Sequence, residues 1–184
     1  KLDDPNLHPQ EVPELRMQKG ELESVGISED GSTLISRDSK GSFRILKGGR
    51  TNNIPTQTNY TNEIGLVDTS SISISSDGGV IVAAHDAGVF SLKSKNNYDK
   101  QDLSNPSNPE KFSSVVVSSD GMTIAGGTQS GNPWIFKHQG GDFQKKIPPT
   151  ATTPIVSIIA INNDEIVIPL CDDDICHLNF YNLN

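Results

Sequence analysis

The strongest constraint on the fold is a pattern that occurs four times along the chain. Its segments are 22–47, 70–93, 112–137 and 155–180. Each segment has a turn aspartate at the same place. These aspartates are Asp30, Asp77, Asp120 and Asp164, which lie 47, 43 and 44 residues apart. A fixed period of this length is typical of repeat proteins, in which neighbouring units stack and bury a shared core.

Within each copy the residues predict three short antiparallel strands. In the second copy, the alternation at residues 72–74 indicates a strand with one buried face. A Ser-x-Asp-Gly turn follows, in which Asp77 can accept hydrogen bonds from the backbone downstream and the glycine can adopt a positive φ. Val80–Ala83 is the predicted second strand, and Val89–Leu92 is the third, after a turn at Asp86–Gly88. The matching second strands are Thr33–Ile35, Thr123–Ala125 and Glu165–Ile168, and the matching third strands are Phe43–Leu46, Trp134–Phe136 and Cys176–Phe180.

A fourth, polar outer strand is expected to precede each copy. The candidates are Val12–Met17, Glu63–Val67, Tyr98–Leu103 and Asp142–Ile147. With four strands per unit, the period fits one blade of a β-propeller. We therefore expect an all-β chain of four four-stranded antiparallel blades, which form a small closed propeller or part of a larger one. No helix of useful length is expected.

The expected organisation is an extended N-terminal arm at residues 1–11, with Pro5 and Pro9, followed by the repeats over residues 12–184. The expected blades are residues 12–47, 62–93, 98–137 and 142–180.

These units resemble degenerate WD40-type blades over roughly residues 12–180. The resemblance is carried by the Ser-x-Asp-Gly turns and by the Asp/Gly turn that leads into an apolar strand at residues 86–90. The Ser-x-Asp-Gly turns occupy residues 28–31, 75–78 and 118–121. The chain departs from that family because no Gly-His dipeptide opens the units and no Trp-Asp dipeptide closes them. Trp134 opens a third strand instead.

The turns also resemble the start of the Asp-box of sialidase-type propellers, at Ser75, Asp77 and Gly79. The Thr-Trp end of that motif is absent from all four units. A sialidase-like site would also need several arginines around one substrate carboxylate. The four arginines all precede the second unit: Arg16, Arg37, Arg44 and Arg50.

Composition and charge narrow the class of partner. The 184 residues carry a formal net charge of −8, and no stripe of Lys and Arg with interleaved aromatics is present. Such a surface repels phosphate backbones, so nucleic acid is not expected as a ligand. No run of 18 apolar residues and no signal peptide is visible in the residues given. We therefore expect a soluble chain with no membrane insertion, and the compartment is left open.

Catalytic motifs are not found, and no catalysis, cofactor or metal is expected. The histidines lie outside any spaced metal or triad motif. They are His8, His85, His138 and His177. Asp172, Asp173 and Asp174 have carboxylates that could hold Ca²⁺, although a solvated acidic turn is the preferred interpretation.

Two further local features leave alternatives open. Cys171 and Cys176 flank the same turn as these aspartates, and either free thiols or a cross-strand disulfide or soft-metal pair fits that spacing. Residues 59–61 form a glycosylation sequon at Asn59, which matters only in a secreted protein.

The expected function is that of a non-catalytic propeller scaffold that binds protein partners, among them further blades or other subunits of a complex. In WD40-like blades the loop between strands two and three opens on the same face as the loop that leads into strand one. On that resemblance, the expected partner-binding residues are Arg37, Asp38, His85, Asp86, Thr128, Gln129, Asp172 and Asp173. Two rivals are an extracellular or coat subunit that polymerises through blade edges and a glycosidase-like propeller of the Asp-box type.

Overall fold

The structure, a computed structural model, is built from short antiparallel strands. It describes residues 20–40, 43–47, 56–59, 69–86, 88–94, 98–104, 110–131, 133–140, 142–146, 160–161, 165–171 and 176–182. Within these ranges the strands form four antiparallel sheets, and no α-helix occurs. The expected all-β class with antiparallel sheets is therefore confirmed. The same ranges contain no helix long and apolar enough to cross a membrane.

The four sheets follow one another along the chain, and we number them in that order. Sheet 1 contains β1 (Leu22–Ile27), β2 (Thr33–Asp38), β3 (Phe43–Lys47) and β4 (Thr56–Asn59). Sheet 2 contains β5 (Thr69–Ile74), β6 (Val80–His85), β7 (Gly88–Lys93) and β8 (Asp99–Asp102). Sheet 3 contains β9 (Phe112–Val117), β10 (Thr123–Thr128), β11 (Trp134–Gln139) and β12 (Asp142–Lys146). Sheet 4 contains β13 (Ala160–Ile161), β14 (Glu165–Cys171) and β15 (Cys176–Asn182).

The outer strand of a sheet follows its three partners in the sequence, so the expectation that it precedes them was wrong. β8 is hydrogen-bonded to β7, and β12 to β11. The reason is local at β12, because Gln139 pairs with Asp142 and leaves a Gly-Gly turn of two residues between them. Such a turn closes a hairpin, and Gly140 has the positive φ of 62° that it requires. The candidates Val12–Met17 and Glu63–Val67 lie outside the described residues.

The turns between the first and second strands have the predicted geometry in sheets 1 to 3. Their glycines all have a positive φ: 69° at Gly31, 65° at Gly78 and 71° at Gly121. A side chain with a Cβ is strained in this conformation, so glycine is the residue that the turn favours. The corresponding turn of sheet 4, at Asp164, lies outside the described residues.

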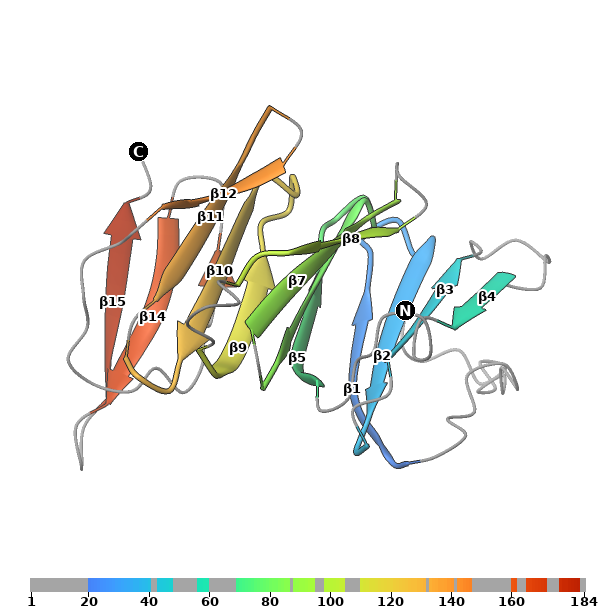
Figure 1. Cartoon of the computed structure of the whole chain (residues 1–184), viewed down its shortest axis with the longest axis horizontal. Helices are drawn as coiled ribbons and strands as arrows, with labels where there is room; N and C mark the ends of the chain where they lie inside the picture. The colour runs from blue at the N-terminus through green and yellow to red at the C-terminus, as the bar shows by residue number, and fades with distance from the viewer. Residues whose placement is uncertain are drawn as a thin grey trace, which may run out of the picture.

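The sheets lie face to face in a row, in chain order (Figure 1). A core between sheets 1 and 2 contains Ile35, Phe43, Ile81 and Phe90, and one between sheets 2 and 3 contains Val82, Val115 and Phe136. A third, between sheets 3 and 4, contains Ala125, Ile135, Ile166 and Ile168. Successive side chains of a strand point to opposite faces of its sheet. The inner sheets are buried on both faces, which explains the uninterrupted apolar run Val80–Ala84 in β6.

Candidate functional site

In sheets 1 to 3 the second turn lies beside the start of the first strand. The pairing shows this directly, because Leu22 is opposite Asp38, Thr69 is opposite His85 and Phe112 is opposite Thr128. In sheets 1 to 3 the loop into the first strand and the second turn therefore lie at the same end of the sheet. We call this end of the sheets the second-turn face; it comprises residues 21–23, 37–40, 69–70, 85–86, 110–112 and 128–131.

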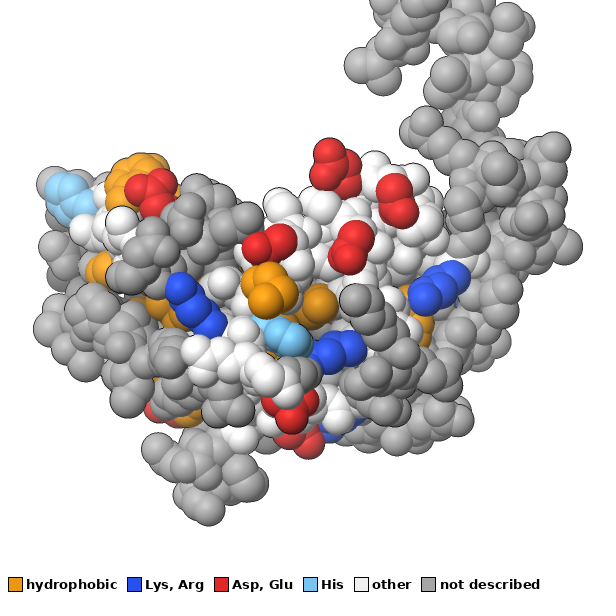
Figure 2. Space-filling view, turned by 90° about the horizontal axis from the view of Figure 1, so that it is seen from above, with side chains coloured by type: hydrophobic (Ala, Val, Ile, Leu, Met, Phe, Trp, Pro, Cys, Tyr) orange, Lys and Arg blue, Asp and Glu red, His pale blue; other side chains and the backbone are white. Residues whose placement is uncertain are grey.

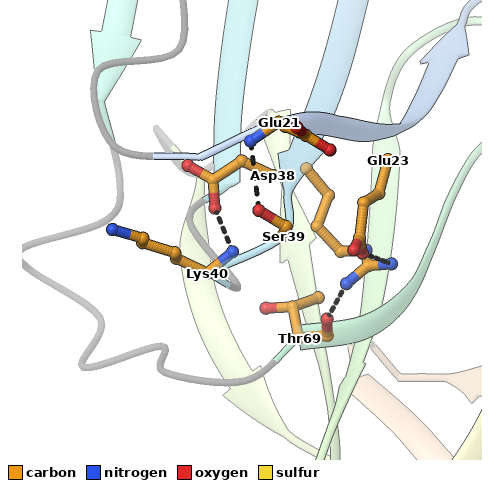
Figure 3. Close-up of polar contacts among 7 residues, drawn as sticks. Glu21, Glu23, Asp38, Ser39, Lys40 and Thr69 are labelled. Atoms are coloured by element: carbon orange, nitrogen blue, oxygen red, sulfur yellow. Dashed lines mark hydrogen bonds and ion pairs between the residues drawn. The ribbon is translucent and has the colours of Figure 1, made fainter.

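Arg37 joins sheet 1 to sheet 2 on this face (Figure 3). Its Nη1 donates a hydrogen bond of 2.5 Å to the backbone oxygen of Thr69, which begins sheet 2. Its Nη2 lies 2.6 Å from the carboxylate of Glu23. The guanidinium is thus committed to a contact between sheets, and most of its side chain is covered.

Asp38 stabilises the second turn of sheet 1 with a buried side chain. The side chain is buried, with 1% of the residue exposed, and its Oδ1 accepts a hydrogen bond of 2.9 Å from the backbone N–H of Lys40. Ser39 completes the turn, because its N–H donates to the Glu21 oxygen and its Oγ accepts from the Glu21 N–H. Asp38 therefore shapes the face without presenting its carboxylate to a partner.

His85 is half-buried at the end of β6, with its ring 6.0 Å from the Phe90 ring. Burial lowers the pKa of the imidazole, and the positive charge of Lys100 lowers it further. The carboxylates of Asp102 and Asp86 act in the opposite direction but more weakly. The lowered pKa favours the neutral imidazole, whose Nε2 is buried.

Asp86 and Gln129 are the exposed members of the expected set. The Asp86 carboxylate lies 2.9 Å from Nζ of Lys111, which leads into sheet 3. The N–H of Gln129 donates to the backbone oxygen of Lys111 over 3.1 Å. In addition, Ser70 Oγ donates to the Phe112 oxygen over 2.9 Å. These contacts link the turns of sheets 2 and 3 to the segment between them, so the face is continuous.

Thr128 is fully buried, at 0% exposed, and its Oγ1 lies 2.8 Å from Ser130 Oγ.

Glu110 is a residue that sequence reasoning missed: its Oε2 accepts hydrogen bonds from Trp134 Nε1 over 3.0 Å and from Ser130 Oγ over 3.4 Å. The available signal for this contact in the sequence was a single acidic residue just before a first strand, together with a Trp that opens a third strand. The contact fixes the second turn of sheet 3 against the segment that precedes β9.

The structure describes the remaining predicted residues only in part or not at all. Asp172 and Asp173 lie outside the described residues. Asn59 ends β4, and only its backbone is described. Cys171 and Cys176 are directly opposite each other in the β14–β15 pairing, although their side chains are not described. In the described part of the chain, no three His, Cys, Asp or Glu side chains gather as a possible metal site.

The opposite end of the sheets carries the Ser-x-Asp-Gly turns, and acidic side chains gather there (Figure 2). The exposed carboxylates of the turns are Glu29, Asp30, Asp77 and Asp120. Ser28 Oγ donates to Asp30 Oδ1 over 2.6 Å and accepts from the Thr33 N–H over 3.0 Å. The same pair of bonds recurs in sheets 2 and 3. The bond from Ser28, with the N–H of Ser32, holds the pKa of Asp30 below its usual value.

Consecutive Ser-x-Asp-Gly turns are joined by backbone hydrogen bonds. The N–H of Glu29 donates to the oxygen of Ser76 over 2.9 Å, and the N–H of Ser76 donates to the oxygen of Ser119 over 3.0 Å. The turns of sheets 1, 2 and 3 therefore form one ladder, in which each sheet donates to the next.

Replacing Ser118 by alanine should lower the free energy of unfolding by about 1–3 kcal/mol, because the buried Thr123 N–H loses the hydroxyl that it donates to. Urea denaturation measures this. Ser119→Ala, at the exposed neighbouring position, is the matched control and should stay within about 0.5 kcal/mol of wild type. Equal stability of the two variants would mean that the Ser118 hydroxyl does not hold the turn.

No protein-family model matches this chain, and no curated protein is found to be similar to it.

Proposed function

We propose that this chain is a non-catalytic scaffold of the WD40-like β-propeller type, which mediates protein–protein interaction within a larger assembly. The four repeats supply successive blades, and their turns supply the binding surface. Support comes from the order of the sheets, which stack face to face in the order in which the repeats occur. Support also comes from the ladder that joins equivalent turns of consecutive sheets.

The observation that carries the proposal is the continuity of the second-turn face. Contacts from Arg37 to Thr69, from Ser70 to Phe112 and from Asp86 to Lys111 tie three sheets together at this end. These contacts hold the backbone of the face, and exposed polar groups lie around it. The exposed groups are Glu23, Asp86, Lys111, Gln129 and Ser130. A preorganised polar surface of this kind suits a protein partner that presents basic or polar residues.

Reversing the charge of Asp86 tests this surface. Asp86→Lys breaks an exposed ion pair with Lys111, and such pairs contribute about 0–1 kcal/mol, so the fold should be retained. A partner is first isolated from source extract with the wild-type chain, and its association rate is then measured. We expect the variant to bind up to about tenfold more slowly at low salt, because charges at the rim of an interface steer association. The difference should shrink at high salt, where exposed charges are screened over about 10 Å.

Glu29→Lys is the matched control, since it makes the same charge change at the opposite end of the sheets. An equal association rate for Asp86→Lys and wild type at low salt would contradict docking at the second-turn face. A slower rate for Glu29→Lys alone would place the docking surface on the Ser-x-Asp-Gly turns instead.

A further inference from the structure

His85 lies where three strands of sheet 2 meet at the second-turn face. It is the last residue of β6, and it pairs with Thr69 of β5 on one side and with Gly88 of β7 on the other. Asp86 follows it directly and forms the ion pair with Lys111. The position of His85 is therefore coupled to residues of the surface that is proposed to dock a partner.

The imidazole of His85 is directed toward sheet 1, at the margin of an apolar core. Alternate residues of a strand share a face, and Ile81 and Ala83 of β6 lie in the core between sheets 1 and 2. Phe90, whose ring centroid is 6.0 Å from that of the imidazole, belongs to the same core. The imidazole Nε2 is buried. A proton added to this ring would therefore place a positive charge where little water can solvate it.

The two carboxylates that act on the imidazole each have a lysine partner. Asp102 lies 3.0 Å from Nζ of Lys100, and Asp86 lies 2.9 Å from Nζ of Lys111. The Lys100 ammonium also lies 5.4 Å from the centroid of the Phe90 ring, on which the imidazole packs. A protonated imidazole would thus be a second cation beside one aromatic ring.

From sheet 1, the charged groups at this junction are Arg37 and Glu23, which form an ion pair (Figure 3). Arg37 also donates to the backbone oxygen of Thr69, and Thr69 is the residue directly opposite His85. Movement of His85 would therefore be transmitted through Thr69 to the contact that joins sheets 1 and 2.

We propose, on the basis of the docking role proposed above for the second-turn face, that His85 is an acid-sensitive switch that releases the protein partner when the pH falls. The neutral imidazole packs on Phe90 and holds the ends of β5, β6 and β7 together. The protonated imidazole turns toward water, and the adjoining residues Thr69 and Asp86 move with it. The second-turn face then loses the preorganised shape on which docking depends.

The direction of the pH dependence follows from the surroundings of the ring. Burial, and next the charge of Lys100, lower the pKa of His85 in the folded chain. In the unfolded chain the imidazole has its ordinary pKa of about 6.5. The unfolded chain therefore binds the proton first as the pH falls, and stability is lost below about pH 6.5. Well above that pH the imidazole is neutral in both states and contributes no pH dependence.

Urea denaturation of the chain by itself, at about pH 7.5 and about pH 5, tests the switch without a partner. His85→Gln keeps a polar side chain that does not titrate, so it should lose less stability on acidification than wild type. His177→Gln, at an exposed position of sheet 4, is the matched control and should lose as much stability as wild type. Equal losses for wild type and His85→Gln would overturn the proposal.

Titration of the wild-type imidazole by nuclear magnetic resonance gives a result even where His85→Gln does not fold. We expect a midpoint below about 6.5, and we expect the amide signals of Thr69 and Asp86 to shift with the same midpoint. A midpoint at or above about 6.5, or amide signals that do not follow the imidazole, would contradict the switch.

Dissociation of the partner gives the regulatory result. The complex with the partner isolated from source extract should dissociate faster at about pH 5 than at about pH 7.5, and His85→Gln should remove most of that acceleration. An equal acceleration in wild type and His85→Gln, or none in wild type, would rule out release through His85. Docking at the second-turn face is judged separately by the Asp86→Lys association rates at neutral pH, so failure of the switch and failure of docking can be told apart.

Discussion

Replacing Phe90 by alanine is expected to lower the free energy of unfolding by about 3–5 kcal/mol. The ring is 0% exposed in β7 and lies in the core between sheets 1 and 2 with Ile35, Phe43 and Ile81. Alanine would leave a cavity in that core, and the surrounding strands cannot collapse into it without breaking their own pairing. Urea denaturation of the purified chain measures the loss.

The matched control is Met122→Ala, which truncates a large side chain at an exposed position in a turn. It should change the stability by no more than about 0.5 kcal/mol. A loss below about 1 kcal/mol for Phe90→Ala would contradict close packing of sheet 1 on sheet 2 around this ring.

The second large loss of stability is expected for Gly78→Ala, and the comparison is with Gly31→Ala. Both glycines have nearly the same positive φ, so each substitution carries the strain of a left-handed residue, about 1–2 kcal/mol. At Gly31 a Cβ would meet nothing within 4 Å. At Gly78 it would lie 2.6 Å from Thr33 Oγ1 and 2.9 Å from Thr33 Cβ, both in sheet 1. Overpacking of this kind adds about 1–3 kcal/mol.

We therefore expect Gly78→Ala to be the more destabilising of the two, with a total loss of about 2–5 kcal/mol. Thermal or urea unfolding of both variants gives the difference. Because the excess arises only from contact between two sheets, equal losses at the two positions would mean that the turn of sheet 2 does not approach sheet 1.

The inner strands could be predicted from the sequence because their side chains alternate or run apolar without a break. Ile72 and Ile74 mark one buried face, and Val80–Ala84 is apolar throughout because both faces of sheet 2 are covered. The outer strands carry no such pattern. β8 and β12 were therefore found at nearly the right residues but assigned to the wrong sheet.

The sequence predicted which residues lie beside the second turns, but it did not predict which of their side chains are exposed to solvent. Strand order places Arg37, Asp38 and His85 beside the second turns. Whether a side chain there meets solvent depends on the neighbouring sheet, and sequence spacing does not show that. Arg37 is covered because it bonds to Thr69 of sheet 2, and Thr128 is buried in its own turn. Glu110 was missed because its partner Trp134 is 24 residues away.

The stacking of equivalent repeats in chain order is tested most directly by nuclear magnetic resonance couplings across hydrogen bonds. Each such coupling identifies the donor nitrogen and the acceptor carbonyl of one hydrogen bond. We expect a coupling from the Glu29 amide nitrogen to the Ser76 carbonyl carbon, and another from the Ser76 nitrogen to the Ser119 carbonyl carbon. Couplings from these two amides to carbonyls within their own sheets would contradict the account.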